Sequence, residues 1–199
     1  MRIDLQSPGD VDVYSLLVST VAPRPIGWVS TLSSAGGRNL APFSYFGIVS
    51  HKPAILCISV SRRKGELKDT SRNLLDTGQA VVHLADRTLA EAMVATGSDV
   101  GPEVDEFSIA DLASVPSAVV RPERLRDAAI AYECRMYRHI EVGDGPTDHF
   151  LLEALVAHIQ DGLLSGTDPP AKKLGLLGRL GGSDYVVVNE VVSIKRAKS

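Results

Sequence analysis

The sequence predicts a mainly β fold with helical insertions, an α+β chain built around an antiparallel barrel. Six or seven runs of apolar and β-branched residues have the length of strands, and turns rich in glycine and proline separate many of them. About three short helical patterns interrupt this series without alternating regularly with the strands, which argues against a doubly wound parallel sheet. The length of 199 residues suits one domain, so we expect residues 1–199 to form a single unit.

In the first half of the chain, proline and glycine residues indicate where helices and strands end. The expected elements are a helix at 12–18, a hairpin of strands 26–32 and 39–46, a strand at 54–61, a helix capped by Asp69 or Thr70 that runs to about Thr77, and a strand at 79–85. Pro23 and Pro25 end the first helix, and Gly36 and Gly37 can take the positive φ angles of a turn. Gly78 is placed to follow the last turn of the second helix.

The second half is more mixed. Its expected elements are a helix at 88–95, a short helix near 106–112, paired strands at 129–142 and 150–160, a loop at 162–182 and a final strand at 185–194. Gly97 ends the first of these helices, and the turn between the paired strands spans 143–146. Glycine and proline occur throughout 162–182, which is typical of a loop.

Composition excludes several classes of partner. The formal net charge is −3, whereas a general nucleic-acid or anionic-membrane binder is normally basic, so we expect neither partner. No apolar run approaches the roughly 20 residues of a membrane span. The first six residues lack the charged-then-apolar order of a signal peptide, so we expect a cytoplasmic protein.

Metal and nucleotide motifs are missing from the sequence. The five histidines show no zinc-ligand spacing, no Cys-x-x-Cys occurs, and we expect no metal site. Neither common glycine-rich nucleotide fingerprint is present, and there is no Gly-x-Ser-x-Gly elbow. Cys57 and Cys134 lie in apolar, strand-like runs, which favours a role in the core over the alternative of a disulfide or redox pair.

The hairpin region at 23–46 concentrates the chemistry of a candidate site. It holds the only tryptophan and two of the four phenylalanines. Its polar side chains are Ser30, Thr31, Asn39 and Ser44, and its apolar ones include Pro25, Trp28, Leu40, Pro42, Tyr45 and Phe46. Because Pro42 removes a backbone donor and disfavours regular strand pairing, nearby backbone groups are free to face a ligand. This mixture suits a flat ring with polar edges, such as an isoalloxazine; the alternative is a core hairpin with a proline at its edge.

A second candidate segment, 61–70, follows a strand and opens a helix. It contains four basic residues within 62–68 and hydroxyl groups at Ser61 and Thr70. Positive charge at a helix N-terminus favours a phosphate ligand. The alternative is a solvated basic loop. Together with the hairpin, however, the segment matches the phosphate and the ring of a single FMN.

Two further residues are candidates for contact with a second ligand. His149 lies at the start of a strand, where it could contact a nicotinamide or assist protonation of a reduced flavin; the alternative is a structural histidine. Arg179 lies within Gly178-Arg179-Leu180-Gly181-Gly182, where it could bind a dinucleotide phosphate or simply face solvent beside a turn.

Several of these motifs resemble those of a known family. The residues are Arg24-Pro25-Ile26-Gly27-Trp28-Val29-Ser30-Thr31, Asn39-Leu40-Ala41-Pro42-Phe43-Ser44-Tyr45-Phe46, Lys68-Asp69-Thr70-x-x-Asn73, Asp148-His149 and Gly178-Arg179-Leu180-Gly181-Gly182-x-x-Tyr185. They resemble the flavin reductase-like proteins with an FMN-binding split β-barrel, the flavoredoxin branch in particular. The resemblance covers roughly residues 12–190.

The resemblance implies a homodimer that binds FMN near the subunit interface. The residues that it implies for the flavin are Trp28, Ser30, Thr31, Asn39, Leu40, Ala41, Pro42, Ser44, Tyr45 and Phe46, and those for its phosphate are Ser61, Arg62, Lys68, Asp69 and Thr70. His149 becomes the expected nicotinamide contact, with Arg179 a second substrate residue. Here Thr147 precedes Asp148-His149, a position where the family commonly has glycine, so this chain departs from the pattern at that point.

The leading functional hypothesis is an FMN-dependent oxidoreductase in which NAD(P)H reduces the flavin, and free flavin, a monooxygenase or another acceptor protein takes the electrons. Two alternatives remain open. One is a flavoredoxin-type electron carrier with little NAD(P)H activity, and the other is a flavin-binding or storage module without redox partners.

Overall fold

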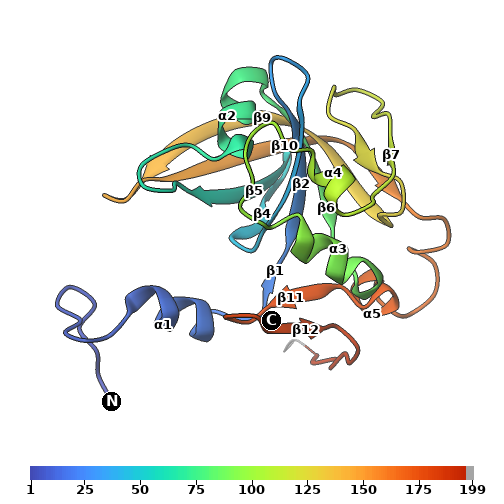
Figure 1. Cartoon of the computed structure of the whole chain (residues 1–199). Coiled ribbons are helices and arrows are strands. Elements are labelled where there is room, and N and C mark those ends of the chain that lie inside the picture. The colour runs from blue at the N-terminus through green and yellow to red at the C-terminus, as the bar shows by residue number, and fades with distance from the viewer. Residues whose placement is uncertain (196–199) are drawn as a thin grey trace.

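A seven-stranded antiparallel sheet forms the body of the computed structural model, which describes residues 1–195 (Figure 1). The strands are β2 (Gly27–Leu32), β3 (Arg38–Phe43), β4 (Phe46–His51), β5 (Ala54–Ser61), β6 (Gln79–Leu84), β9 (Ile130–Val142) and β10 (Thr147–Ile159). Their order across the sheet is β3-β2-β6-β9-β10-β5-β4. The sheet curls until β3 also approaches β5, and the expected antiparallel barrel is thereby confirmed.

A smaller sheet lies below the barrel (Figure 1). It consists of β1 (Arg24–Pro25), β11 (Leu177–Arg179) and β12 (Tyr185–Val187), in the order β1-β11-β12. A two-stranded ribbon of β7 (Ser114–Val115) and β8 (Arg124–Leu125) lies beside the barrel. The small sheet joins the two ends of the chain, because β1 precedes the barrel and β11 and β12 follow it.

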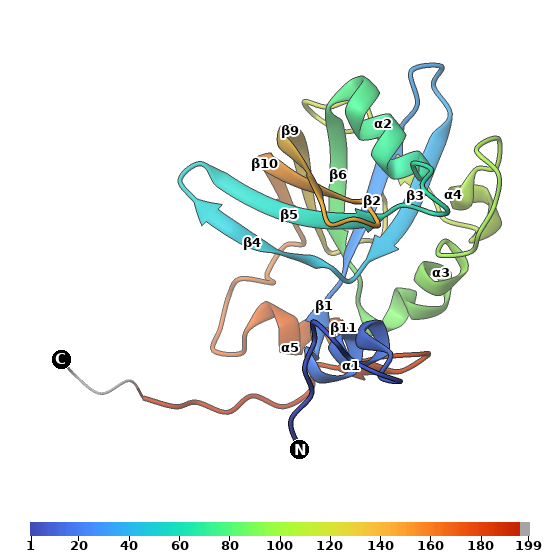
Figure 2. The same ribbon diagram turned by 90° about the vertical axis from the view of Figure 1, so that its left-hand side faces the viewer.

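Helices surround the barrel as short insertions. They are α1 (Val13–Thr20), α2 (Asp69–Thr77), the 3₁₀ turn η1 (Arg87–Leu89), α3 (Ala90–Ala95), α4 (Glu106–Ile109) and α5 (Pro170–Leu174). Figure 2 shows α2 across the upper end of the curled sheet, α3 and α4 beside β3, and α1 and α5 near the small sheet. None of the helices in residues 1–195 is long and apolar enough to cross a membrane.

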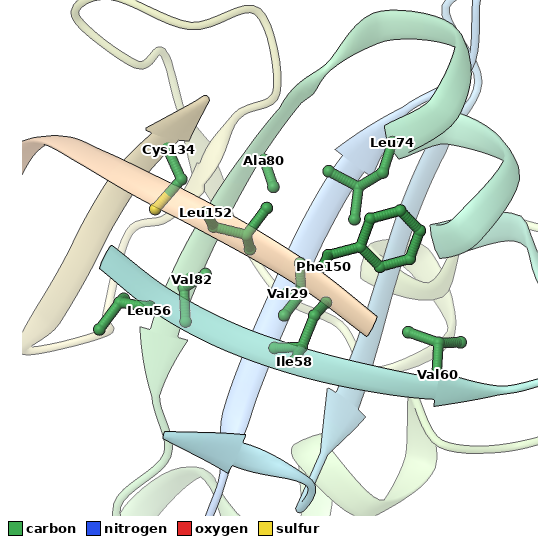
Figure 3. Close-up of a cluster of buried hydrophobic side chains, with 10 residues drawn as sticks. All are labelled: Val29, Leu56, Ile58, Val60, Leu74, Ala80, Val82, Cys134, Phe150 and Leu152. Atoms are coloured by element: carbon green, nitrogen blue, oxygen red, sulfur yellow. The ribbon is translucent and has the colours of Figure 1, made fainter. Parts of the chain in front are cut away.

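The barrel interior is filled by one apolar cluster, shown in Figure 3. Its members are Val29, Leu56, Ile58, Val60, Leu74, Ala80, Val82, Cys134, Phe150 and Leu152. A second cluster around Trp28, Leu40, Met93 and Phe107 packs between β2, β3 and the insertions α3 and α4. Side chains from both faces of β2 are therefore buried, which explains why nearly all of its successive residues are buried instead of alternating between buried and exposed.

Most of the expected elements occur, with four corrections. The strand at 54–61 has the expected bounds, and the helix ending at Thr77 is followed by Gly78 in the left-handed conformation, as expected. The chain bends at Ser44 and Tyr45, so the segment expected as one strand to residue 46 ends at Phe43, and a separate strand, β4, begins at Phe46. The final strand ends at Val187, and the expected loop at 162–182 contains α5 and β11. The expected cap of α2 is also wrong, because Lys68 occupies the N-cap.

Both cysteines are free thiols in the structure. Cys134 is fully buried in the barrel cluster, and this burial raises the pKa of its thiol to about 12. Such a thiol is uncharged at neutral pH and acts as a small apolar side chain. Cys57 is partly buried, and burial raises the pKa of its thiol as well.

Candidate functional site

Two adjoining cavities run along β3, and we call them together the cleft. The larger has a volume of about 1010 Å³ and lies between α1, the end of β3, α3 and the β11–β12 turn. The smaller has a volume of about 570 Å³ and lies between β3, the 61–72 segment and the 96–106 loop. Pro42, Lys68 and Gly97 line both cavities, so the two halves meet at the middle of the cleft.

The cleft brings together most of the residues that sequence reasoning selected. Those that line it are Asn39, Ala41, Pro42, Ser44, Tyr45, Ser61, Arg62, Lys68, Asp69, Thr70 and Arg179. They come from the hairpin, the basic segment and the C-terminal strand. Convergence of three separated segments on one cleft is the result that a shared ligand requires.

Four of the expected contact residues lie below the cleft instead. Trp28, Ser30, Thr31 and Leu40 are buried, with at most 1% of each exposed, and line neither cavity. The Trp28 indole Nε1 donates to Thr96 Oγ1 at 2.9 Å, so the tryptophan holds the α3 terminus that precedes Gly97. Trp28 thereby supports the wall to which Thr96 and Gly97 contribute.

Phe46 and His149 lie away from the cleft. Phe46 packs against Gly27 and lines a third, apolar cavity between the small sheet and the barrel. His149 lies on β10 opposite Ser59, and its Nδ1 is 2.8 Å from Ser59 Oγ. Neighbouring Asp148 and Phe150 are buried while His149 is only partly so, because successive strand residues face opposite sides. Within one chain, therefore, His149 does not reach the cleft.

A buried network of amides and hydroxyls ties the hairpin to α2. Asn39 Nδ2 donates to Thr31 Oγ1 and to Thr70 Oγ1, both at 3.0 Å, and Asn73 Nδ2 donates to Thr31 Oγ1 at 3.0 Å. This network accounts for the Lys-Asp-Thr-x-x-Asn spacing, which places Thr70 and Asn73 on the same face of the helix. Asn73, part of that motif but not selected as a site residue, is needed to fix the α2 terminus against β3.

The N-terminus of α2 faces the smaller cavity without a side-chain cap. Lys68 occupies the N-cap and its side chain makes no capping hydrogen bond, so first-turn N–H groups are available to an anion. Four cations line this cavity, and three of them are committed: Arg62 to Asp148 and Glu141, Arg63 to Asp99, and Arg72 to Asp69. Of these four cations, Lys68 is the one without an ion pair in the part of the chain that the structure describes.

Arg62 anchors the basic segment to the barrel. Its Nε and Nη2 bind the two carboxylate oxygens of Asp148 at 3.1 and 2.9 Å, and Asp148 is fully buried. His139 Nε2 lies 2.9 Å from the same carboxylate. Burial alone would raise the pKa of Asp148, but the hydrogen bonds from Arg62 and His139 outweigh it and lower that pKa. The Arg62 side chain thus fixes the segment's position.

Glu106 is a lining residue that sequence reasoning missed. Its side chain is buried at the N-terminus of α4, where Oε2 accepts a hydrogen bond from Leu40 N–H at 3.1 Å. Burial raises the pKa of this carboxyl above its usual value. The carboxyl satisfies a backbone donor of β3 that strand pairing leaves open. No local signal in the mixed 98–126 region pointed to it.

Two arginines shape the larger cavity. Arg24 is buried, and its Nη1 donates to the carbonyls of Val21 at 2.8 Å and Leu180 at 3.0 Å, which ties the end of α1 to the end of β11. Arg179 lies on a strand rather than in the expected loop, with its guanidinium 4.4 Å from the Tyr185 ring centroid. A cation over an aromatic face gives the cavity a wall that is both flat and charged.

The residues described, 1–195, contain no cluster of three or more His, Cys, Asp or Glu side chains that could hold a metal ion. The donor set of the cleft is instead backbone N–H groups, hydroxyls, amides, Lys68 and several arginines beside apolar residues such as Pro42. These are groups that hold an organic phosphate and a planar ring.

Comparison with known proteins identifies relatives over most of the chain. Residues 19–169 match the family described as flavin reductase like domain. Nitrilotriacetate monooxygenase component B from Bacillus cereus is 31% identical with a TM-score of 0.92, covering 98% of both chains. The 2-nitrobenzoate 2-nitroreductase of Pseudomonas fluorescens is 28% identical with a TM-score of 0.87, covering 99% of this chain and 96% of that one. A Shewanella frigidimarina protein with a split barrel domain has a TM-score of 0.86 at 13% identity, covering 99% and 100%, and confirms the expected split barrel fold.

Proposed function

The chain belongs to the flavin reductase-like domain family, and on that premise we propose that it is a single-domain FMN-binding oxidoreductase, an NAD(P)H-dependent flavin reductase. Its electrons go to free flavin or to a partner protein. The observation that carries the proposal is the meeting of the hairpin and the basic segment in one cleft. Their local chemistry suits the two ends of the same molecule.

The smaller cavity is assigned to the FMN phosphate. Lys68 supplies an unpaired positive charge, and the uncapped N-terminus of α2 supplies backbone donors. The hydroxyls of Ser61 and Thr70 line the same cavity and add donors, and the hydrogen bond from Asn39 holds Thr70 in place. Together these groups bind a dianion through charge and through directed hydrogen bonds.

The larger cavity is assigned to the ring and to the hydride donor. Pro42, Ile26 and Met93 offer apolar surface, and Ser44 offers a hydroxyl at the edge. Its volume of about 1010 Å³ exceeds what one ring system needs, because small-molecule pockets typically span about 300–1,000 Å³ for a whole ligand. The remaining space beside Arg179 is where we place the nicotinamide nucleotide, with the guanidinium facing its phosphates.

FMN, when bound, supplies the hydride and electron chemistry, and the chain supplies position and polarity. Lys68 and the α2 terminus hold the phosphate, and the Asn39–Thr70 hydrogen bond keeps the hairpin at a fixed distance from that terminus. Pro42 and Gly97 line both halves of the cleft, so these two residues place few side-chain atoms in the passage between the halves. No residue of the chain is required as a nucleophile.

The proposal includes a homodimer and an electron-accepting partner. The Bacillus cereus relative is named as one component of a monooxygenase, which supports a second protein as acceptor. The Pseudomonas fluorescens relative is named for reduction of a nitroaromatic acid, which makes a small aromatic acceptor a second candidate. His149 is retained as a proposed nicotinamide contact that a second copy of the chain would have to bring to the cleft.

An absorbance spectrum of the purified protein, before and after anaerobic addition of NADH and of NADPH, tests the function. We expect a bound flavin that either nucleotide bleaches within seconds. A protein that neither carries nor binds added FMN would contradict the central assignment. A protein that binds FMN but is reduced only by another protein would instead be a flavoredoxin-type electron carrier.

Substitution of Lys68 tests the phosphate assignment. Lys68→Ala removes a charge-assisted contact of about 1.5–3 kcal/mol, so FMN affinity should fall about tenfold or more. The loss should shrink at high salt because a partly exposed charge is screened. Lys64→Ala is the matched control, since Lys64 lies in the same segment but lines neither cavity. Equal affinities of the two variants would overturn the assignment.

A further inference from the structure

An apolar trough lies between the small sheet and the barrel, and Arg24 and Ile26 line both this trough and the larger cavity of the cleft. Its volume is about 480 Å³, and nearly all of its lining is apolar. Phe46 and Ile48 of β4, Leu56 of β5, Tyr132 of β9 and Val186 of β12 represent its walls. Arg24 is the one charged residue among those that line it, and its guanidinium donates to the backbone carbonyls of Val21 and Leu180.

One side of the trough is bounded by an unpaired strand edge. β4 is the last strand of the seven-stranded sheet, with β5 on one side and no strand on the other in residues 1–195. Ile48 on this strand is 82% exposed and Val49 is 51% exposed. An exposed apolar edge strand carries unpaired N–H and C=O groups and invites pairing with another strand.

The chain itself contains a segment suited to that edge. After Val188, whose N–H donates to Leu176 O at 3.0 Å, residues 189–195 leave the body without regular structure, as Figure 2 shows. Every residue of this arm is exposed, even its apolar ones: Val192 is 75% exposed and Ile194 is 86% exposed. β-Branched residues favour an extended backbone. An apolar arm that stays in water gains no stabilisation from burial by itself.

We propose that the arm of residues 189–195 docks on a second copy of this chain, in its trough and along the free edge of its β4. Arm, trough and edge occur on every chain, so two copies related by a twofold axis cover both arms and both troughs at once. The exchange uses main-chain hydrogen bonds for affinity and the alternate apolar side chains for fit, as in strand addition. Val186 and Val188 line the trough from which the arm departs, so the two docked arms lie close to the twofold axis.

This inference deepens the proposed homodimer, but it does not depend on flavin, so the two can fail separately. Arm exchange is tested on protein without nucleotide. Flavin binding is read from the absorbance of the same samples.

The test is a cross-link that only two chains can form. In a Cys57→Ala background, one preparation carries Ile48→Cys and a second, differently tagged one carries Val192→Cys. After mixing, subunit exchange and mild oxidation, we expect a disulfide-linked pair that carries both tags. Val119→Cys replaces Ile48→Cys in the control, because Val119 is an exposed valine, 54% accessible, that lines no cavity described above.

A second measurement guards against a misplaced cysteine. Val192→Asp should weaken dimerisation at least tenfold in light scattering across a concentration series, whereas Val119→Asp should leave it unchanged. The inference is overturned by no cross-link above the control, or by an unaltered dimer of Val192→Asp. It is also overturned if a chain carrying both new cysteines cross-links only within itself, which would place the arm on its own trough, or if the protein is a monomer.

Discussion

His83 on β6 should make the folded protein lose stability as the pH falls from 6.5 toward 4. Its imidazole is fully buried, with Nδ1 2.8 Å from Trp28 O and Nε2 3.0 Å from the Leu125 N–H. Nδ1–H therefore donates to the carbonyl and Nε2 accepts from the amide, an arrangement that only the neutral ring satisfies. Burial lowers the pKa of His83 to about 4, and the positive charge of Arg124 adds to the effect.

The sign follows from comparing the two states. The unfolded chain takes up a proton near the ordinary value of 6.5, whereas the folded ring stays neutral down to about 4. The stabilisation is thus fully present above pH 6.5 and is lost as the pH falls through the folded pKa. At about 1.4 kcal/mol for each pKa unit, the whole loss is roughly 3 kcal/mol, of which about 1.5 kcal/mol falls between pH 6.5 and 5.

Urea unfolding of the wild type and of His83→Gln at closely spaced pH values checks this magnitude. The variant starts less stable, and the stability difference between the two proteins should shrink by about 1.5 kcal/mol from pH 6.5 to 5. All other titrating groups are common to both proteins and cancel in that difference. A constant difference, or an NMR titration of the folded His83 ring with a midpoint near 6.5, would refute the reasoning.

Other substitutions test the packing and the site. Gly27→Ala should destabilise the fold by about 1–3 kcal/mol in thermal or urea unfolding, because the added Cβ would lie 2.8 Å from Phe46 Cδ2, whereas Gly47→Ala meets only an ordinary contact at 3.8 Å and should cost less. Glu133→Gln should cost about 2 kcal/mol at neutral pH, since the buried carboxylate accepts three backbone N–H bonds. Those bonds outweigh burial and lower the Glu133 pKa, so its contribution is present above pH 4.5 and lost below it, which a pH series of the same unfolding curves would show. His149→Ala should leave FMN affinity unchanged in a fluorescence titration, and a lowered NAD(P)H rate in that variant would support its nicotinamide role.

The elements that local pattern defines were predicted well from sequence, and those that depend on distant pairing were not. The strand at 54–61 and the helix before Gly78 are bounded by residues within the same segment, so their ends follow from local chemistry. The small sheet pairs Arg24 with Arg179, and no local sequence pattern near either residue predicts this pairing. The separate strand β4 was missed because the chain bends at Ser44 and Tyr45 without a glycine to mark the break.

The candidate site shows the same division. Sequence reasoning found which segments meet, because the hairpin and the basic segment each carry their own chemistry. It did not find which side chains line the cleft: Trp28 was expected to flank the ring, but it is buried and lines neither cavity, since β2 has buried neighbours on both faces. It also missed Glu106, whose importance comes from a β3 backbone amide far away in sequence.

Arg24 fastens α1 to the end of β11, and these two elements line only one of the two cavities of the cleft. The smaller cavity, which we assign to the phosphate, is lined by residues within 19–169, the part that matches the family, whereas much of the larger cavity comes from α1 before it and from Arg179 to Tyr185 after it. The two ends of the chain thus form one wall of the cleft, and this wall is separate from the part that matches the family. Exchange of these ends between relatives should swap the preferred donor or acceptor while leaving the affinity for flavin as it was.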